Sequence, residues 1–314
     1  MRSADLNRMS DVRKGYICTL SYGALLGLIG FFTTTLGNMG LTSFEINFQR
    51  FLVTVISIGL FLMVTRGKDG FRIDLKGFAL CAFLGILGDV IMAYCYVEAI
   101  ASIGMGLAAV ILYTAPVFST ILARVFLKTP FNRCKGIALV LNLLGCFLAV
   151  TGGKASLGGL PASGVIIAFL CSIFFAVNIL VTQFATDGRD PVTVCFYTFL
   201  VGVICLFFIV RPWNTGLEIW APSVLMVSIP YGLIEGALGY VLYYTGIKLV
   251  QDPAKVNVLS SIEVAVAAVF GIIVYNEPHS LLRFVGMALI LVSMWFVGRT
   301  PGEPRLEAGS HCSD

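Results

Sequence analysis

Residues 104–127 read GMGLAAVILYTAPVFSTILARVFL, a stretch in which Arg124 is the only charged residue. A helix needs roughly 20 apolar residues to cross about 30 Å of hydrocarbon at about 1.5 Å per residue, so this stretch can span a membrane. It does not alternate apolar and polar residues, as a strand of a membrane barrel must. Two further helix starts are indicated by Asp190-Pro191 and Asp252-Pro253, each a capping carboxylate before a proline. The predicted spans are 16–37, 45–64, 76–100, 104–127, 135–151, 162–185, 191–210, 222–250, 253–275 and 280–298.

The composition of the whole chain is that of a polytopic membrane protein. Of its 314 residues, 58% are apolar and only 12% are charged, with a mean hydropathy of +0.93. A soluble domain has about a quarter of its residues charged, so this chain has too few charges to cover a surface in water. The composition therefore excludes a soluble enzyme, a disulfide-stapled secreted domain and a disordered scaffold. The nine cysteines contain no C-x-x-C pair, which indicates apolar packing residues and not disulfides or metal ligands.

Basic residues favour one side of the predicted membrane. When successive spans run in opposite directions, all but four of the 21 Lys and Arg residues fall on the same side. Basic loops stay in the cytoplasm, so we predict a multi-pass protein of the inner or plasma membrane with both termini cytoplasmic. The net charge of +4 reflects these loops, which face lipid headgroups, and gives no reason to expect nucleic acid. The residues on the other side are Arg50, Lys154, Arg211 and Arg283.

The second half of the chain repeats the first. The string GIAL at 136–139 recurs as GMAL at 286–289. We predict two copies of a five-helix unit, at 15–153 and 163–299, and because five is odd the second copy enters the membrane from the opposite side. Such inverted repeats are typical of secondary transporters, whose substrate site lies near the membrane midplane where the copies meet. The predicted fold class is an all-α membrane protein with ten transmembrane helices in two inverted five-helix repeats.

Two longer strings carry a family resemblance. Residues 94–130 read YCYVEAIASIGMGLAAVILYTAPVFSTILARVFLKTP and residues 243–278 read YYTGIKLVQDPAKVNVLSSIEVAVAAVFGIIVYNEP; both resemble the EamA repeats of the drug/metabolite transporter superfamily. The resemblance implies a ten-helix exporter or permease in which spans 1, 3, 4, 6, 8 and 9 surround a central cavity and spans 5 and 10 are peripheral. The superfamily's substrates are diverse, so no substrate is implied. Matching residues are Arg50, Pro116, Glu263 and Glu277; departures are Val264, where the family has proline, and Thr129, where it has an acid.

Three carboxylates fall near the centres of predicted spans: Asp89, Glu235 and Glu263. An ionisable residue there costs about 2.5–3.5 kcal/mol on insertion scales, so each needs a reason. We expect no Lys or Arg at their depth, since Arg50 comes only a few residues into its own span. Small residues share their helix faces, which indicates that the acids point into the bundle. Two interpretations stay open: binding of a proton, a cation or a substrate amine, or a structural hydrogen bond made by a neutral acid.

Polar, aromatic and proline side chains within the spans extend the candidate site. Tyrosines can line a cavity or anchor helices, and hydroxyl and amide side chains can line a cavity or bond neighbouring helices, so both interpretations stay open. Pro116 and Pro230 predict kinks in their spans, which suit a bundle whose halves rock against each other. The candidate cavity-lining residues are Thr34, Tyr96, Tyr113, Pro116, Asn178, Thr182, Tyr243 and Ser260.

The predicted function is transport. An anionic substrate would need buried Lys or Arg, and the expected midplane charges are acidic only, so we expect neutral, zwitterionic or cationic metabolites such as amino acids. We predict a secondary exporter with access alternating between the repeats, in exchange for protons at Asp89 or Glu263. An uncoupled facilitator or channel is the alternative. The expected partners are the small-molecule substrate and membrane lipids; a homodimer stays open, and nucleic acid is not expected.

No enzyme is predicted. The sequence has no P-loop, no H-E-x-x-H and no G-x-S-x-G motif, so it carries no visible machinery for ATP-driven pumping or hydrolysis. The string GILGD at 85–89 is close to the G-x-G-D motif of intramembrane aspartyl proteases, but its spacing is wrong and the Tyr-Asp partner motif is missing. Such proteases need two carboxylates that share one proton. We therefore expect no catalytic residue, no cofactor and no bound metal.

Overall fold

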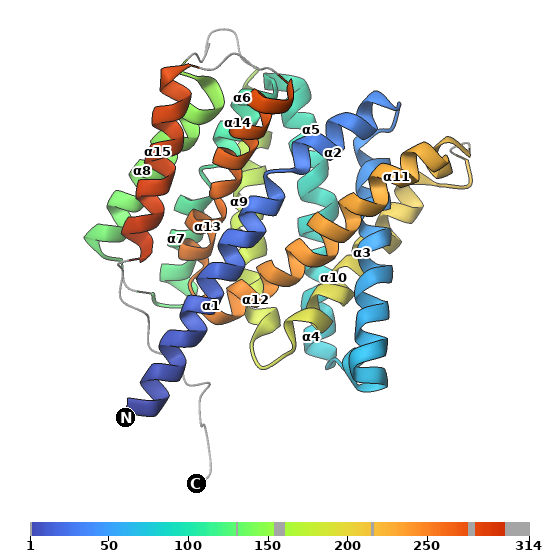
Figure 1. Ribbon diagram of the computed structural model, residues 1–314, viewed down its shortest axis with the longest axis horizontal. Helices are drawn as coiled ribbons and strands as arrows, with labels where there is room; N and C mark the ends of the chain where they lie inside the picture. The colour runs from blue at the N-terminus through green and yellow to red at the C-terminus, as the bar shows by residue number, and fades with distance from the viewer. Residues whose placement is uncertain (1, 130, 154–160, 215–216, 276–279, 299–314) are drawn as a thin grey trace.

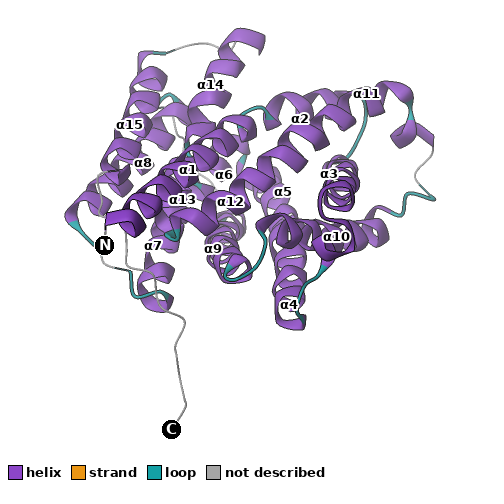
Figure 2. Ribbon diagram, turned by 60° about the horizontal axis from the view of Figure 1, so that its bottom comes forward, coloured by secondary structure: helices purple, strands orange, loops and turns teal. Residues whose placement is uncertain are grey.

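The molecule is a bundle of membrane-length helices (Figures 1 and 2). The computed structural model describes residues 2–129, 131–153, 161–214, 217–275 and 280–298, and within these ranges it contains no strand. Ten helical segments are long and apolar enough to cross a membrane. Each overlaps one of the predicted spans, which confirms the all-α fold class and its ten transmembrane helices.

Several spans consist of more than one helical piece. The first half comprises α1 (Arg2–Leu26), α2 (Ile29–Asn38), α3 (Ser43–Arg66), η1 (Gly67–Phe71), α4 (Leu75–Leu84), η2 (Gly85–Ile91), α5 (Met92–Ile103), α6 (Met105–Leu112), α7 (Ala115–Phe126) and α8 (Arg133–Thr151). The second half comprises α9 (Ala162–Thr186), α10 (Pro191–Val210), η3 (Leu217–Trp220), α11 (Pro222–Tyr231), η4 (Gly232–Gly239), α12 (Tyr240–Val250), α13 (Pro253–Ser260), α14 (Ile262–Tyr275) and α15 (Leu281–Gly298).

Helices of the two halves interlock. Several pairs of helices, each with one helix from either half, pack against each other. These pairs are α8 with α15, α3 with α10, α1 with α12, α5 with α9, and α7 with α13. The pair α8 and α15 lies at one edge of the bundle (Figure 1). Gly286, in the repeated GMAL string, permits their close approach, since a Cβ there would lie 2.7 Å from the carbonyl oxygen of Gly145. Spans 5 and 10 are thus peripheral, as the resemblance implies.

Corresponding spans of the two halves are broken at corresponding places. The fourth span is interrupted by a turn at Tyr113–Thr114, between α6 and α7, and the ninth at Ser261, between α13 and α14. Pro116 lies in the first turn of α7, where its missing N–H has no intrahelical acceptor. This break confirms the predicted interruption of the fourth span. The first span is also broken, between α1 and α2, whereas its counterpart α9 is continuous.

The third and eighth spans each contain a π-helical segment, η2 and η4, at corresponding positions of the two halves. A π-turn loosens the regular hydrogen-bond ladder and is frequently found at functional sites. In the eighth span the segment follows Pro230, which ends the regular ladder of α11 and accounts for the predicted irregularity there. Both π-segments are rich in glycine, and they carry two of the three candidate acids, Asp89 and Glu235.

Acidic side chains cap and pair helices at the end of the bundle where α1 begins. Asp190 accepts a hydrogen bond from the Thr193 N–H at 3.0 Å, and Asp252 accepts one from the Ala254 N–H at 3.1 Å, which confirms both predicted helix starts. Three ion pairs at this end join the first half to the second: Arg66–Asp190 at 2.7 Å, Lys135–Asp252 at 2.7 Å and Arg189–Asp74, whose Nη2 and Oδ2 are 2.7 Å apart.

These pairs change the acidity of the carboxylates in the loops. The hydrogen bond from Arg189 holds the pKa of Asp74 well below its usual range. Partial burial raises the pKa of Asp190, but the hydrogen bonds from Arg66 and Thr193 outweigh it, so this pKa is also lowered. Both groups are therefore carboxylates at neutral pH.

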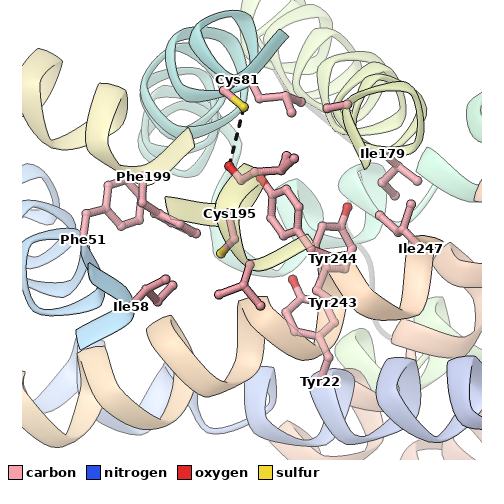
Figure 3. Packing of buried hydrophobic residues seen from close by; sticks show 14 of the residues in the cluster. Tyr22, Phe51, Ile58, Cys81, Ile179, Cys195, Phe199, Tyr243, Tyr244 and Ile247 are labelled. Carbon is pink, nitrogen blue, oxygen red and sulfur yellow. Dashed lines mark hydrogen bonds between the residues drawn. The ribbon is translucent and has the colours of Figure 1, made fainter. Parts of the chain in front are cut away.

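The largest cluster of buried apolar side chains lies between the halves. Phe51 on α3 meets Phe199 on α10 edge-on, with ring centroids 4.9 Å apart. Cys81 on α4 donates its thiol to the Val194 carbonyl at 3.6 Å, one of the contacts seen in Figure 3. None of the described cysteines forms a disulfide. The buried ones, such as Cys81 and Cys195, act as small apolar packing residues.

Candidate functional site

One candidate acid, Glu263, lies where the two broken spans meet. It is the second residue of α14, directly after the break at Ser261, and the Tyr113 hydroxyl at the other break donates to its Oε1 at 2.7 Å. The amino-terminal end of a helix attracts negative charge, so this position also favours a carboxylate. Glu263 is only partly buried. The structure therefore brings together two of the predicted site residues, Tyr113 and Glu263, one from each half.

Other aromatic and small residues surround this carboxylate. Tyr96 on α5 and Tyr22 on α1 both lie within electrostatic range of Glu263. Gly27, at the end of α1, packs so closely on α14 that a Cβ would lie 2.9 Å from the Glu263 carbonyl oxygen. Three broken spans, the first, fourth and ninth, thus have their breaks close to one carboxylate.

A second candidate acid, Glu235, forms a buried ion pair. Its Oε2 lies 2.8 Å from Nη1 of Arg50, and the two side chains are 1% and 7% exposed. The guanidinium carbon of Arg50 lies 4.7 Å from the ring centroid of Phe51, 5.4 Å from that of Tyr231 and 5.8 Å from that of Tyr240. Rings placed in this way stabilise a desolvated cation.

Glycines let η4 approach α3 closely enough for this pair to form. A Cβ on Gly232 would lie 2.5 Å from Cβ of Val53, and a Cβ on Gly236 would overlap the hydroxyl of Thr54. That hydroxyl donates to the Arg50 carbonyl at 2.8 Å or to the Gly232 carbonyl at 3.2 Å, so it fills the contact between the helices. The small-residue face predicted beside Glu235 therefore serves close packing.

The expectation that Glu235 has no basic residue at its depth is wrong. The sequence comparison counted residues along upright spans, but α11, η4 and α12 run obliquely across α3 (Figure 1). The long Arg50 side chain meets Glu235 at the contact between α3 and η4. Since this acid carries a matched cation, its structural interpretation is favoured.

A group of tyrosines lies near the two acids. Tyr22 lies within electrostatic range of both Glu235 and Glu263. Its ring centroid is 4.7 Å from that of Tyr243 and 5.7 Å from that of Tyr240. Tyr243 is only 3% exposed and is part of the buried cluster in Figure 3. Tyr22 therefore connects the surroundings of the two acids.

The third candidate acid, Asp89, lies in η2, and its side chain is outside the described residues. The neighbouring Gly88 is covered by the side-chain amide of Asn178 on α9, which leaves no room for a Cβ. Asn178 is partly buried there. The structure therefore places one predicted lining residue, Asn178, against the π-segment that carries Asp89.

The remaining predicted lining residues differ in their surroundings. Thr182 on α9 is fully buried, and its hydroxyl has no hydrogen-bond partner among the described residues. Ser260 is buried and donates to the Val256 carbonyl at 2.9 Å. Thr34 on α2 is exposed. Their role in lining a cavity stays a prediction, and Glu277, one of the residues of the resemblance, is outside the described residues.

Sequence reasoning missed two contributors to this region. Tyr22 was not singled out because tyrosines are frequent in membrane helices, and only its neighbour Gly23 marks a close helix contact. The sequence indicates Arg50 through the resemblance and through its position near the start of its span, but not as the partner of an acid. Its position inside a span was a signal, since a buried Arg needs a carboxylate partner.

Comparisons with known proteins place the chain in a family. The model of the EamA-like transporter family matches twice, at residues 13–151 and 162–299. An uncharacterized transporter of Archaeoglobus fulgidus is 25% identical over 294 residues, 92% of this chain and 97% of its own length. The uncharacterized transporters YxxF and YwfM of Bacillus subtilis are 23% and 26% identical, over 85% and 69% of this chain and 86% and 73% of their own lengths.

A crystal structure of a protein 15% identical in sequence has a similar fold. The TM-score is 0.73, and the match covers 90% of this chain and 95% of the other. At this identity the likeness concerns the fold alone. It agrees with the interlocked ten-helix arrangement described above.

Proposed function

Since the chain belongs to the EamA-like transporter family and is a membrane transporter rather than an enzyme, we propose that it is a secondary exporter driven by proton exchange. Its proposed substrates are small neutral, zwitterionic or cationic metabolites, such as amino acids. The observation that carries this proposal is the partly buried carboxylate of Glu263, which accepts a hydrogen bond from Tyr113 at 2.7 Å where two broken spans meet.

The charge balance around Glu263 supports a role in coupling. No Lys or Arg among the described residues forms an ion pair with it. The neutral donor Tyr113 and the end of α14 stabilise its negative charge, but no described cation neutralises it, so the carboxylate can bind a proton or an organic cation. A proton and a cationic substrate compete for the same oxygen atoms. This competition is what an exchanger needs, because arrival of one releases the other.

The Arg50–Glu235 pair bears on the charge of the proposed substrates. Arg50 lies beside the rings of Tyr231 and Tyr240, but its charge is met by Glu235 at 2.8 Å. A phosphate or carboxylate group would have to displace that acid, at the cost of leaving a buried charge without a partner. Among the described side chains of this region, the carboxylate of Glu263 has no paired cation, which supports neutral, zwitterionic or cationic substrates over anionic ones.

Matched irregularities in the two halves support alternating access. The breaks in the fourth and ninth spans and the π-segments η2 and η4 occur at equivalent places in both halves. Broken helices near the midplane bind substrates in transporters built from inverted repeats, and one half rocks against the other around that site. We propose that these four places absorb the change in helix direction.

The distribution of basic residues supports a location in the inner or plasma membrane with both termini cytoplasmic. Loops containing Lys68, Arg72 and Lys128 lie at the end of the bundle where α1 begins. Alkaline phosphatase fused after Val210 should be active and the same enzyme fused after Arg66 inactive, because it folds only outside the cytoplasm. The reverse pattern would overturn this orientation.

Flux into proteoliposomes tests the transport proposal. The purified protein is reconstituted, a pH gradient is imposed, and uptake of a panel of radiolabelled amino acids is measured. We expect uptake against a concentration gradient by the wild type and none by Glu263→Gln. Glu98→Gln is the matched control, because Glu98 is an exposed acid on α5.

The same assay distinguishes a proton exchanger from an uncoupled facilitator. An uncoupled facilitator would equilibrate the substrate at a rate that the pH gradient leaves unchanged, in the wild type and in Glu263→Gln alike. That result would remove the proton-exchange part of the proposal. Accumulation of the substrate only in Glu263→Gln, or equally in both proteins, would contradict the role assigned to this carboxylate.

A further inference from the structure

A groove on the outside of the bundle is separate from the region of the two acids. It lies between the beginning of α4 and the end of α9 and has a volume of about 390 Å³. Its lining residues are Lys76, Leu80, Phe184, Asp187 and Arg189. The transport proposal uses none of them.

The polar residues of this groove lie at the ends of the two spans, and the apolar residues lie further along them. Lys76 is in the first turn of α4 and Asp187 directly follows α9, so both lie where these spans leave the hydrocarbon. Leu80 and Phe184 are about one turn further in, and Phe184 is 39% exposed. A polar rim above an apolar floor matches a phospholipid, with its headgroup at the rim and the first part of an acyl chain on the floor.

The free charges at the rim are one cation and one anion. Arg189 is engaged by Asp74, with Nη2 and Oδ2 2.7 Å apart, so its charge is already balanced. Lys76 and Asp187 are exposed, and neither takes part in an ion pair among the described residues. A ligand for this rim therefore carries both a negative and a positive group.

We propose that the groove binds phosphatidylethanolamine from the adjoining leaflet, with the lipid phosphate at Lys76 and its ammonium at Asp187. A primary ammonium donates hydrogen bonds to a carboxylate, which the quaternary amine of phosphatidylcholine cannot do. Phosphatidylglycerol has no cation for Asp187, and its net negative charge meets the repulsion of that carboxylate. The groove thus selects a headgroup by two charges of opposite sign.

Native mass spectrometry of the full-length protein tests this proposal. The protein is mixed with equal amounts of the ethanolamine, choline and glycerol phospholipids, and the retained lipids are compared. We expect phosphatidylethanolamine to bind best. The ethanolamine ammonium donates a hydrogen bond that choline cannot, and such a bond is worth about fivefold in binding, so Asp187→Asn should remove a preference of that size over phosphatidylcholine. Lys76→Gln should weaken the binding of all three lipids by about fivefold, because each of them has a phosphate.

Matched controls use the same charge changes on η1, outside the groove. Lys68→Gln and Asp69→Asn should leave lipid binding as in the wild type, and thermal unfolding shows that all variants are folded. Equal binding of the ethanolamine and choline lipids by the wild type would overturn the proposal. Strongest binding of phosphatidylglycerol, increased further by Asp187→Asn, would identify an anionic-lipid site instead.

Discussion

Glu235 and Glu263 are two glutamates of the second half, both inside apolar spans, yet their surroundings differ. Glu235 is fully buried, is paired with Arg50 at 2.8 Å and lies at a contact between helices that glycines make close. Glu263 is partly buried, accepts a hydrogen bond from the neutral Tyr113 and lies at a break between helices. The first acid joins the two halves through its cation, and the second has the surroundings that the proposed exchange needs.

The difference shows that an acid in a membrane helix is not by itself a site for chemistry. A buried carboxylate with a matched cation stays charged and changes little when a proton or substrate arrives. A carboxylate with only a neutral donor responds to both. The charge of the partner, and not depth, separates the surroundings of the two acids.

The largest effect should follow from breaking the ion pair. Arg50→Met leaves the charge of Glu235 buried without a cation and should lower the free energy of unfolding by about 3–5 kcal/mol. Thermal unfolding of the purified protein measures the loss. The double variant Arg50→Met/Glu235→Leu should regain most of it, because no unpaired charge remains. Equal stability of wild type and single variant would show that the pair does not hold the halves together.

Neutralising the second acid should affect transport and not folding. Glu263→Gln keeps an oxygen acceptor for Tyr113, so its unfolding temperature should stay near that of the wild type while gradient-driven flux is lost. Glu235→Gln should do the opposite and lower the unfolding temperature, since Arg50 loses its carboxylate. Unfolding and flux measured on both variants check this contrast. Similar losses of stability in Glu263→Gln and Glu235→Gln would contradict the different roles assigned to the two acids.

The close contact at Glu235 should tolerate no added methyl group. In Gly236→Ala the new Cβ would overlap the Thr54 hydroxyl, and overpacking of this kind costs about 1–3 kcal/mol of stability. Adding Thr54→Ala should reduce the cost. Gly30→Ala is the control, because no atom lies within 4 Å of a Cβ there. If thermal unfolding ranks Gly30→Ala as the more damaging change, the close approach is not what supports the ion pair.

Removing the donor at Glu263 should have a moderate effect. A hydrogen bond to a charged group is worth about 1.5–3 kcal/mol, so Tyr113→Phe should lower coupled flux about tenfold if the bond acts during transport. Tyr94→Phe, which alters a tyrosine 56% exposed on α5, should have no such effect. Flux at several pH values checks both variants. If the Tyr113→Phe protein is as active as the wild type, the Tyr113 hydroxyl has no part in transport.

The smallest effect concerns the loop ion pairs. The pKa values of Asp74 and Asp190 are lowered in the folded protein from a usual value of 3.8. Their contribution to stability is therefore fully present above about pH 4 and is lost as the pH falls further through the folded values. Unfolding temperatures between pH 7 and pH 5 should show no change from these groups. Asp74→Asn should flatten the decline below pH 4 and leave the Glu263-dependent flux unaltered.

Local patterns predicted most of the fold. Hydropathy located all ten spans, and the Asp-Pro pairs at 190–191 and 252–253 located two helix starts to the residue. Pro116 indicated the break in the fourth span, but no proline in the sequence next to Ser261 indicates the matching break there. The π-segments were not predicted either, because their glycines are also compatible with a regular membrane helix.

The site was predicted only as a set of candidates. Asp89, Glu235 and Glu263 stood out because charge is rare in a span, and the sequence alone treated them alike. The tilt of α11, η4 and α12 across α3 decided that Glu235 meets Arg50, a contact between residues far apart in the chain. The approach of two breaks decided that Glu263 meets Tyr113.

The sequence by itself therefore determined the solvent, the number of spans, the repeat and the rarity of its buried charges. These depend on hydrophobicity and spacing, which are local properties of the chain. Only the tertiary structure decided which acid is paired with a cation and which accepts a hydrogen bond from a neutral tyrosine. That choice depends on helix tilt, on glycines that permit close contact and on side chains that reach across the interface, none of which leaves a local pattern.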